Sequence, residues 1–136
     1  MGQQQLLLVI LVTIIVGIAT VVAINTFGSA ADSANVDAVR QDLASIAASA
    51  QGYYMKPEML GGGGRDFSDI TFNDITFPGE VTGDDAATNE NGDYALSAKA
   101  VGSFTVTGTP SAGGSVAAVV YPDSISMGNY TPPTTP

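Results

Sequence analysis

The feature that most constrains this sequence is an apolar run of 19 residues, 6–24, interrupted only by Thr13, Gly17 and Thr20. As a helix, the run would be about 28 Å long, close to the ~30 Å hydrocarbon core of a membrane. The two threonine hydroxyls can bond to carbonyls one turn earlier, which makes them tolerable in lipid. The rest of so short a chain could hardly enclose this helix on every side. The run therefore predicts a membrane-length helix.

A secretory signal peptide is an alternative interpretation of the same run. Such a peptide has a positive start and an apolar stretch of about 7–15 residues. Here the first five residues carry no Lys or Arg and the apolar run is longer, although Ser29-Ala30-Ala31 offers small residues for cleavage. Positive charge beside a span normally orients it in a membrane. Because no such charge precedes Arg40, we expect that a basic leader has been removed ahead of residue 1.

The helix is predicted to continue as an amphipathic segment over residues 28–56, beyond an apolar membrane or filament-core segment at 1–27. No proline occurs before Pro57, and Gly28 can bend a helix without ending it. Apolar residues then recur at intervals of three and four, which marks one helical face: Val36, Val39, Leu43, Ile46, Ala50 and Tyr53. This seam is expected to pack on the chain's own domain. Small residues off the seam are equally suited to packing between subunits.

The helix is expected to end near Lys56, because the residue before a proline disfavours helical geometry. The four glycines 61–64 then predict a flexible linker over residues 57–66. A phosphate-binding P-loop would need Lys and then Ser or Thr after its glycines, and Arg65 and Asp66 stand there instead.

Residues 67–130 are predicted to form a small antiparallel β domain. Alternating apolar residues indicate strands near 94–98, 104–106 and 116–121, with an edge strand near 125–127. Residues 83–92 read as a polar acidic loop, and residues 131–136 as an extended Pro/Thr tail. The predicted fold class is α+β: a long N-terminal α-helix, apolar in its first half and amphipathic in its second, packed on a small antiparallel β-sheet.

One segment of this domain is ambiguous, because Asp-Ile-Thr-Phe occurs at 69–72 and again at 74–77. In one unbroken strand, an offset of five residues would place the two Ile/Phe pairs on opposite faces. A turn or bulge at Asn73-Asp74 would bring both pairs to the same face.

The composition excludes several chemistries. The chain has no His and no Cys, so it cannot build a Ser-His-Asp triad, a His/Cys zinc site or a disulfide. A net charge of −9 argues against nucleic-acid binding, which needs clustered Lys and Arg. We therefore expect no enzymatic activity, no cofactor and no nucleic acid in any filament core.

Asn89, Asn91 and Asp93 are weak metal-site candidates. They place side-chain oxygens at alternate positions, as at the start of a calcium loop. Tyr94 and Ala100, however, stand where an EF-hand requires Gly and Glu. A solvated turn with Asn91-Gly92 at its tip is the simpler interpretation.

A second local motif is Asn129-Tyr130-Thr131, which matches the N-glycosylation pattern. Asn129 is therefore a glycosylation candidate, although triplets of this kind are also common by chance.

The small and polar start, the uncharged apolar helix, its amphipathic continuation and the β domain together resemble type IV pilins and pseudopilins. The sequence likeness is confined to residues 1–27. The resemblance implies that a membrane peptidase removes a basic leader and that the new N-terminus is often methylated. It also implies storage in the inner (cytoplasmic) membrane, followed by assembly of the apolar helices into the core of an extracellular filament by dedicated pilus machinery.

Two features depart from that family. Pilins usually carry Glu at the fifth mature position, where Gln5 stands if Met1 is the mature start. The resemblance implies that this Glu pairs with a neighbour's N-terminal amine. The amide of Gln5 can donate and accept hydrogen bonds but cannot neutralise the charge of that ammonium. If the mature chain starts at Gln3, that residue could cyclise to a neutral form. The proline often found midway in the apolar segment is also absent, so we expect a more continuous helix with any melting near Gly17.

The resulting hypothesis is a major pilin, a homo-oligomeric structural subunit of a helical filament. Its predicted assembly residues are polar at the start and mostly apolar thereafter: Gln3, Gln4, Gln5, Leu6, Val9, Thr13, Gly17 and Ile24. Two alternatives stay open. One is a minor pilin or pseudopilin of a secretion or DNA-uptake machine, and the other is a surface binding module on a single membrane anchor.

Overall fold

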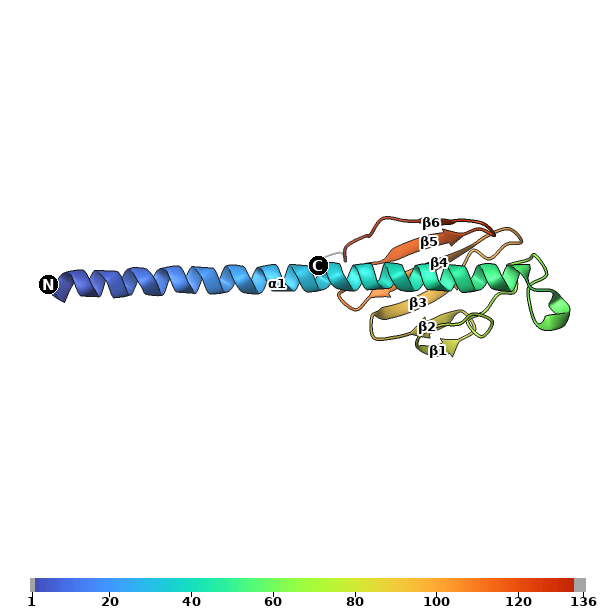
Figure 1. The fold of residues 1–136 in the computed structure, drawn as a ribbon, viewed down its shortest axis with the longest axis horizontal. Helices are drawn as coiled ribbons and strands as arrows, with labels where there is room; N and C mark the ends of the chain where they lie inside the picture. The colour runs from blue at the N-terminus through green and yellow to red at the C-terminus, as the bar shows by residue number, and fades with distance from the viewer. Residues whose placement is uncertain (1, 134–136) are drawn as a thin grey trace. The chain divides into compact units, whose positions relative to one another are not determined.

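The computed structural model describes residues 2–133 and contains one α-helix, one short 3₁₀ helix and a six-stranded sheet (Figure 1). In chain order the elements are α1 (Gly2–Met55), η1 (Glu58–Leu60), β1 (Glu80–Gly83), β2 (Ala86–Thr88), β3 (Gly92–Ser97), β4 (Phe104–Pro110), β5 (Val116–Val120) and β6 (Ile125–Met127). The chain divides into an N-terminal unit, Met1–Ala34, and a C-terminal unit, Asn35–Pro136. The predicted α+β class is confirmed.

Helix α1 is helical at every described residue up to Met55, including Gly17 and Gly28. Its predicted end is confirmed, because Pro57 follows and the last turn closes with Lys56 N–H donated to the Gly52 and Tyr53 carbonyls. The continuity expected from the lack of a proline is also found. No segment near Gly17 departs from helical structure.

The predicted seam of α1 forms the helical side of the core in the C-terminal unit. Its members from Val36 to Ala50 are buried together with Ala47, and Tyr53 is half-buried. They face inward-pointing side chains of the sheet: Tyr94, Leu96, Phe104, Val106, Val116, Ala118 and Val120. Residues 35–55 thus cover one face of the sheet (Figure 1).

The sheet is an antiparallel meander in which strand order follows chain order from β1 to β6. The strands predicted near 94–98, 104–106, 116–121 and 125–127 correspond to β3, β4, β5 and β6. The acidic loop predicted at 83–92 is partly wrong, because it contains β2 and the turn that joins β2 to β1. Ala87 is the only buried residue of this hairpin, so no large apolar alternation marked it.

The repeated Asp-Ile-Thr-Phe segment forms turns and no strand. Asp74 N–H donates to the Thr71 carbonyl at 3.1 Å, and the Asp74 carboxylate accepts from the Thr71 N–H at 3.0 Å. This turn reverses the chain between the copies. Ile70, Phe72 and Ile75 are consequently all buried, as the predicted turn at Asn73-Asp74 would require.

The glycine segment after the helix is bonded closely to the end of α1. The Gly63 N–H donates to the Tyr53 carbonyl at 2.8 Å and the Gly64 N–H to the Lys56 carbonyl at 2.9 Å. A Cβ atom added at Gly63 would lie 2.4 Å from the Asp66 carbonyl oxygen and 2.6 Å from Tyr53 Cε1. The backbone therefore approaches its neighbours too closely for any side chain at that position.

Two glycine substitutions near this junction should have opposite effects on stability. Gly52→Ala is expected to raise the free energy of unfolding by about 0.5–1 kcal/mol, because a Cβ there meets nothing within 4 Å and alanine favours a helix. Gly63→Ala should lower it by roughly 1–3 kcal/mol, because the added methyl group overpacks the loop. Urea unfolding of both variants measures the difference, and equal effects would contradict the close approach at Gly63.

Candidate functional site

The first candidate site is the surface of α1 in the N-terminal unit. Every residue from Gly2 to Ala34 is exposed, and the large apolar side chains from Leu6 to Ile24 are each between 53% and 65% exposed. Phe27 is 77% exposed. By length and composition, α1 is the one helix among residues 2–133 that could cross a membrane.

The threonine hydroxyls within this surface are satisfied by the helix itself. The hydroxyls of Thr13, Thr20 and Thr26 donate to the carbonyls of Val9, Val16 and Val22 at 2.8, 2.8 and 2.9 Å, one turn earlier in each case. The expected back-bonding of Thr13 and Thr20 is thus confirmed. At these three positions an approaching partner therefore meets the threonine methyl groups rather than free hydroxyl donors.

Gly17 lies in a shallow apolar hollow on α1, lined by Thr13, Ile14, Gly17, Ile18, Val21 and Val22. A Cβ added at Gly17 would meet nothing within 4 Å. Packing within the chain therefore does not require this glycine, although glycine in a helix interior costs about 1 kcal/mol relative to alanine.

The predicted assembly residues fall into two groups. Leu6, Val9, Thr13, Gly17 and Ile24 are separated by three, four, four and seven positions, which places them on one face of α1. The glutamines 3–5 are consecutive, so their side chains point in three directions around the helix. The three glutamines therefore lie on different sides of the helix.

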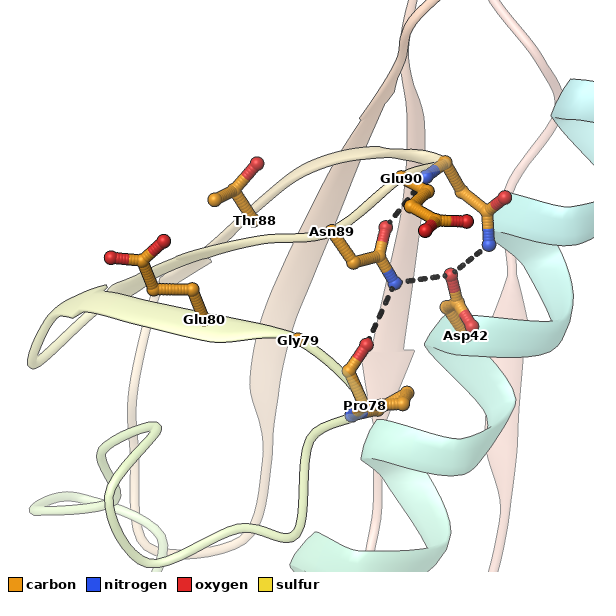
Figure 2. Close-up of a pocket in the computed structure, with 8 residues that line it drawn as sticks. Asp42, Pro78, Gly79, Glu80, Thr88, Asn89 and Glu90 are labelled. Atoms are coloured by element: carbon orange, nitrogen blue, oxygen red, sulfur yellow. Dashed lines mark hydrogen bonds between the residues drawn. The ribbon is translucent and has the colours of Figure 1, made fainter.

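The second candidate site is a polar cluster around Asp42, where α1 meets the loop between β2 and β3 (Figure 2). One carboxylate oxygen, Oδ2, accepts hydrogen bonds from Asn89 Nδ2 at 2.9 Å, Asn91 Nδ2 at 2.8 Å and the Tyr94 hydroxyl at 2.5 Å. The carboxylate thus ties the helix to the loop and to strand β3.

The hydrogen bonds also fix which way the amide of Asn89 faces. Asn89 Oδ1 accepts from the backbone N–H groups of Asn91 and Gly92 at 2.9 and 3.2 Å, so its NH₂ group must be the end that faces Asp42. A carboxylate can only accept, and Asn91 therefore also presents its NH₂ group.

The charge state of Asp42 reflects this arrangement. Partial burial by itself would raise the pKa of the Asp42 carboxyl, but hydrogen bonds from Asn91, Tyr94 and Asn89 outweigh it and lower that pKa below 3.8. Burial and the bond to the Asp42 carboxylate together raise the pKa of the Tyr94 hydroxyl far above its ordinary value. Asp42 is ionised and Tyr94 is neutral at physiological pH.

The three metal-site candidates serve other contacts. Asn89 and Asn91 turn N–H groups toward Asp42, and the Asp93 carboxylate accepts from the Thr88 hydroxyl at 2.6 Å. The Asn89 side-chain oxygen is likewise occupied, since it accepts from the backbone N–H groups of Asn91 and Gly92. Within residues 2–133, no group of three or more His, Cys, Asp or Glu side chains could hold a metal ion.

An open hollow lies beside the Asp42 cluster, lined by Asp42, Pro78, Gly79, Glu80, Thr88, Asn89, Glu90 and Asn91 (Figure 2). Three of these residues are acidic: Asp42, Glu80 and Glu90. The hydrogen bonds of Asp42 at the edge of this hollow hold the helix against the loop and strand β3.

Asp42 belongs to a set of polar residues that the sequence reasoning missed. Asn35 Nδ2 donates to the Asn91 carbonyl at 2.8 Å, and the Ser49 hydroxyl accepts from the Thr76 N–H at 2.8 Å. Asn35, Asp42 and Ser49 are seven positions apart and flank the apolar seam. That heptad spacing is the signal in the sequence from which the three positions could be predicted to share one side of the helix.

The glycosylation candidate, Asn129, is exposed on the segment after β6. The neighbouring Tyr130 hydroxyl donates to the Gly113 carbonyl at 2.8 Å, and Thr131 forms an isolated bridge with Ser115. Of the predicted tail, residues 134–136 lie outside the described part of the chain.

The stability of the C-terminal unit should depend on pH through Asp42. Because its pKa is lower in the folded chain than in the unfolded chain, its contribution is fully present above the ordinary Asp pKa and is lost as the pH falls through the folded value. Asp42→Asn should therefore lower the free energy of unfolding by about 1–3 kcal/mol at neutral pH, and the deficit should shrink in acid. Urea titrations of both proteins at several pH values measure this, and a deficit independent of pH would contradict it.

Comparison of the chain with protein-family models, with curated proteins and with solved structures gives no match. What the structure itself establishes is an α+β chain with one long helix, apolar in its first half, that could cross a membrane by length and composition. Its second half packs on a six-stranded antiparallel sheet.

Proposed function

We propose that this chain is a major pilin, a structural subunit of an extracellular, type IV pilus-like helical filament. The observation that carries the proposal is the exposed apolar surface of α1 from Leu6 to Phe27, which is part of the same helix as the buried seam of a folded domain. A soluble monomer rarely exposes so long a contiguous apolar surface.

A second copy of the same helix is a suitable cover for that surface. The N-terminal unit has a single charged residue, Asp32, so an equally uncharged helix can pack along residues 6–27 without burying an unpaired charge. Before assembly the same surface would face lipid in the inner (cytoplasmic) membrane. Since lipid is as apolar as a neighbouring helix, close packing and polar pairing must decide association.

The predicted assembly residues fit those two requirements. The face that carries Val9, Gly17 and Ile24 offers the hollow at Gly17 to a neighbour's side chain. Because the threonine hydroxyls are occupied within α1, polar pairing falls to Gln3, Gln4 and Gln5. Their three directions would let one subunit pair with several neighbours at the filament axis.

A contact of this type between different faces of identical subunits does not close on itself and generates a helical filament. The acidic C-terminal unit would form the outside of that filament on the cell surface. The proposal includes leader removal, N-terminal methylation and assembly by pilus machinery, all of which rest on the resemblance to pilins.

The decisive experiment is to express the full chain behind a basic leader, together with a pilus assembly system, and to examine sheared extracellular material by electron microscopy and mass spectrometry. Filaments composed mainly of this chain, with a processed N-terminus, would support the proposal. A trace of the chain in filaments made of another subunit would identify a minor pilin or pseudopilin. A detergent-soluble monomer with an unprocessed initiator Met and no filaments would overturn the proposal in favour of a membrane-anchored module.

A further inference from the structure

The loop that binds Asp42 contains the one Asn-Gly dipeptide of the chain, Asn91-Gly92. The glycine is required by the fold, because a Cβ there would lie 2.1 Å from the Thr109 carbonyl oxygen. The sequence therefore keeps, at a central contact of the domain, the dipeptide in which backbone attack on an asparagine side chain is least hindered.

The chemistry of such a dipeptide is a spontaneous cyclisation. The backbone nitrogen of Gly92 attacks Cγ of Asn91, a new C–N bond closes a succinimide ring, and the side-chain amide leaves as ammonia with the proton from the Gly92 N–H. Water then opens either of the two imide bonds and yields aspartate or isoaspartate. The step needs no reagent other than water.

We propose that Asn91 is a deamidation site that the folded domain keeps unreactive. Opening of the contact between α1 and the loop then allows Asn91 to deamidate irreversibly. The proposal stands independently of the filament role.

Three sets of contacts oppose the cyclisation. The leaving amide is held by Asp42 Oδ2 at 2.8 Å, and the attacking Gly92 N–H is engaged by Asn89 Oδ1 at 3.2 Å. The Asn91 carbonyl accepts from Asn35 Nδ2 at 2.8 Å and from the Ser111 N–H at 2.9 Å. Rotation of the Asn91 side chain toward the Gly92 nitrogen must break the first two bonds and strain the others.

The product would not be able to restore the contact. An aspartate at position 91 would replace a hydrogen-bond donor to Asp42 with a second carboxylate at the same place, and two like charges repel there. An isoaspartate would also lengthen the backbone beside Gly92, which has no spare room against Thr109. Deamidation would therefore leave the helix less firmly attached to the sheet.

The test follows deamidation of the full chain in detergent by peptide mass mapping, at neutral pH, with the protein folded or unfolded in urea. In urea, Asn91 should react faster than the chain's other asparagines, and folding should slow it by at least about tenfold. The exposed Asn129, which is followed by Tyr130, serves as an internal control whose rate should change little. Equal deamidation rates at Asn91 in the folded and unfolded chain would overturn the proposal. A rate at Asn91 in urea no higher than the rates of the other asparagines would also overturn it.

A pair of variants tests the role of the contacts. Asn89→Ala removes the acceptor for the Gly92 N–H and should speed deamidation of Asn91 in the folded chain by at least about tenfold. Asn73→Ala is the matched control, because the Asn73 amide contacts Asp84 elsewhere in the domain at 3.3 Å. Circular dichroism verifies that both variants are folded. If Asn89→Ala does not fold, Asp42→Asn replaces it and should also speed deamidation of Asn91. An unchanged deamidation rate in whichever variant is folded contradicts the proposal.

Discussion

Replacing Val9 with aspartate is expected to abolish filament assembly while the C-terminal unit remains folded. Val9 is 62% exposed in a helix segment without charge, so the substitution disturbs no contact of the domain core. It would, however, place a carboxylate among apolar helices. In a comparable apolar environment, the centre of a membrane helix, an aspartate costs roughly 2.5–3.5 kcal/mol. Electron microscopy of sheared filaments and urea unfolding of the same protein measure the two outcomes separately.

The matched control for this substitution is Val101→Asp. Val101 is 59% exposed in a loop of the C-terminal unit, so the change in charge and size is identical and only the position differs. We expect normal filaments from the control. Gly17→Leu should also hinder assembly, because it fills the hollow that a neighbour would occupy. Normal filaments from both Val9→Asp and Gly17→Leu would disprove assembly through this helix.

Leu43→Ala should produce a large loss of stability in the C-terminal unit. Leu43 is fully buried in the seam, between the helix and the sheet. Truncation of a buried leucine removes apolar contacts and leaves a cavity, which typically lowers the free energy of unfolding by about 2–5 kcal/mol. Urea or thermal unfolding of the chain in detergent, followed by near-ultraviolet circular dichroism of the tyrosines, measures this loss.

Leu60→Ala is the corresponding control, since Leu60 is 66% exposed and the removed atoms are the same. Its effect should lie within about 0.5 kcal/mol of zero. A loss at Leu43 no larger than the loss at Leu60 would mean that α1 does not contribute to the core.

The helix and the central strands were predictable because their apolar residues recur with the period of the element. The seam from Val36 to Ala50 alternates intervals of three and four, and β3, β4 and β5 alternate buried and outward residues. The hairpin of β1 and β2 lacked that signal. Its one inward side chain is Ala87, and the residues around it resemble a loop in composition.

The polar cluster was harder to predict, because its contacts join residues far apart in the chain. Asp42 and Asn91 are separated by 49 positions, and nothing local shows that a carboxylate on the helix faces two amides in a loop. The spacing of Asn89, Asn91 and Asp93 suggested oxygen ligands. The fold instead turns the nitrogen ends of both amides toward Asp42. The identity of an asparagine in the sequence does not reveal which end of its amide faces a partner.

The order of the six strands has a consequence for how the domain forms. Each strand pairs with its neighbour in the chain, so the sheet can grow by successive hairpins with short loops, a pattern that favours rapid folding. The helical side of the core comes from residues 36–50, which precede every strand. During synthesis the seam is therefore made before any of the strands on which it packs.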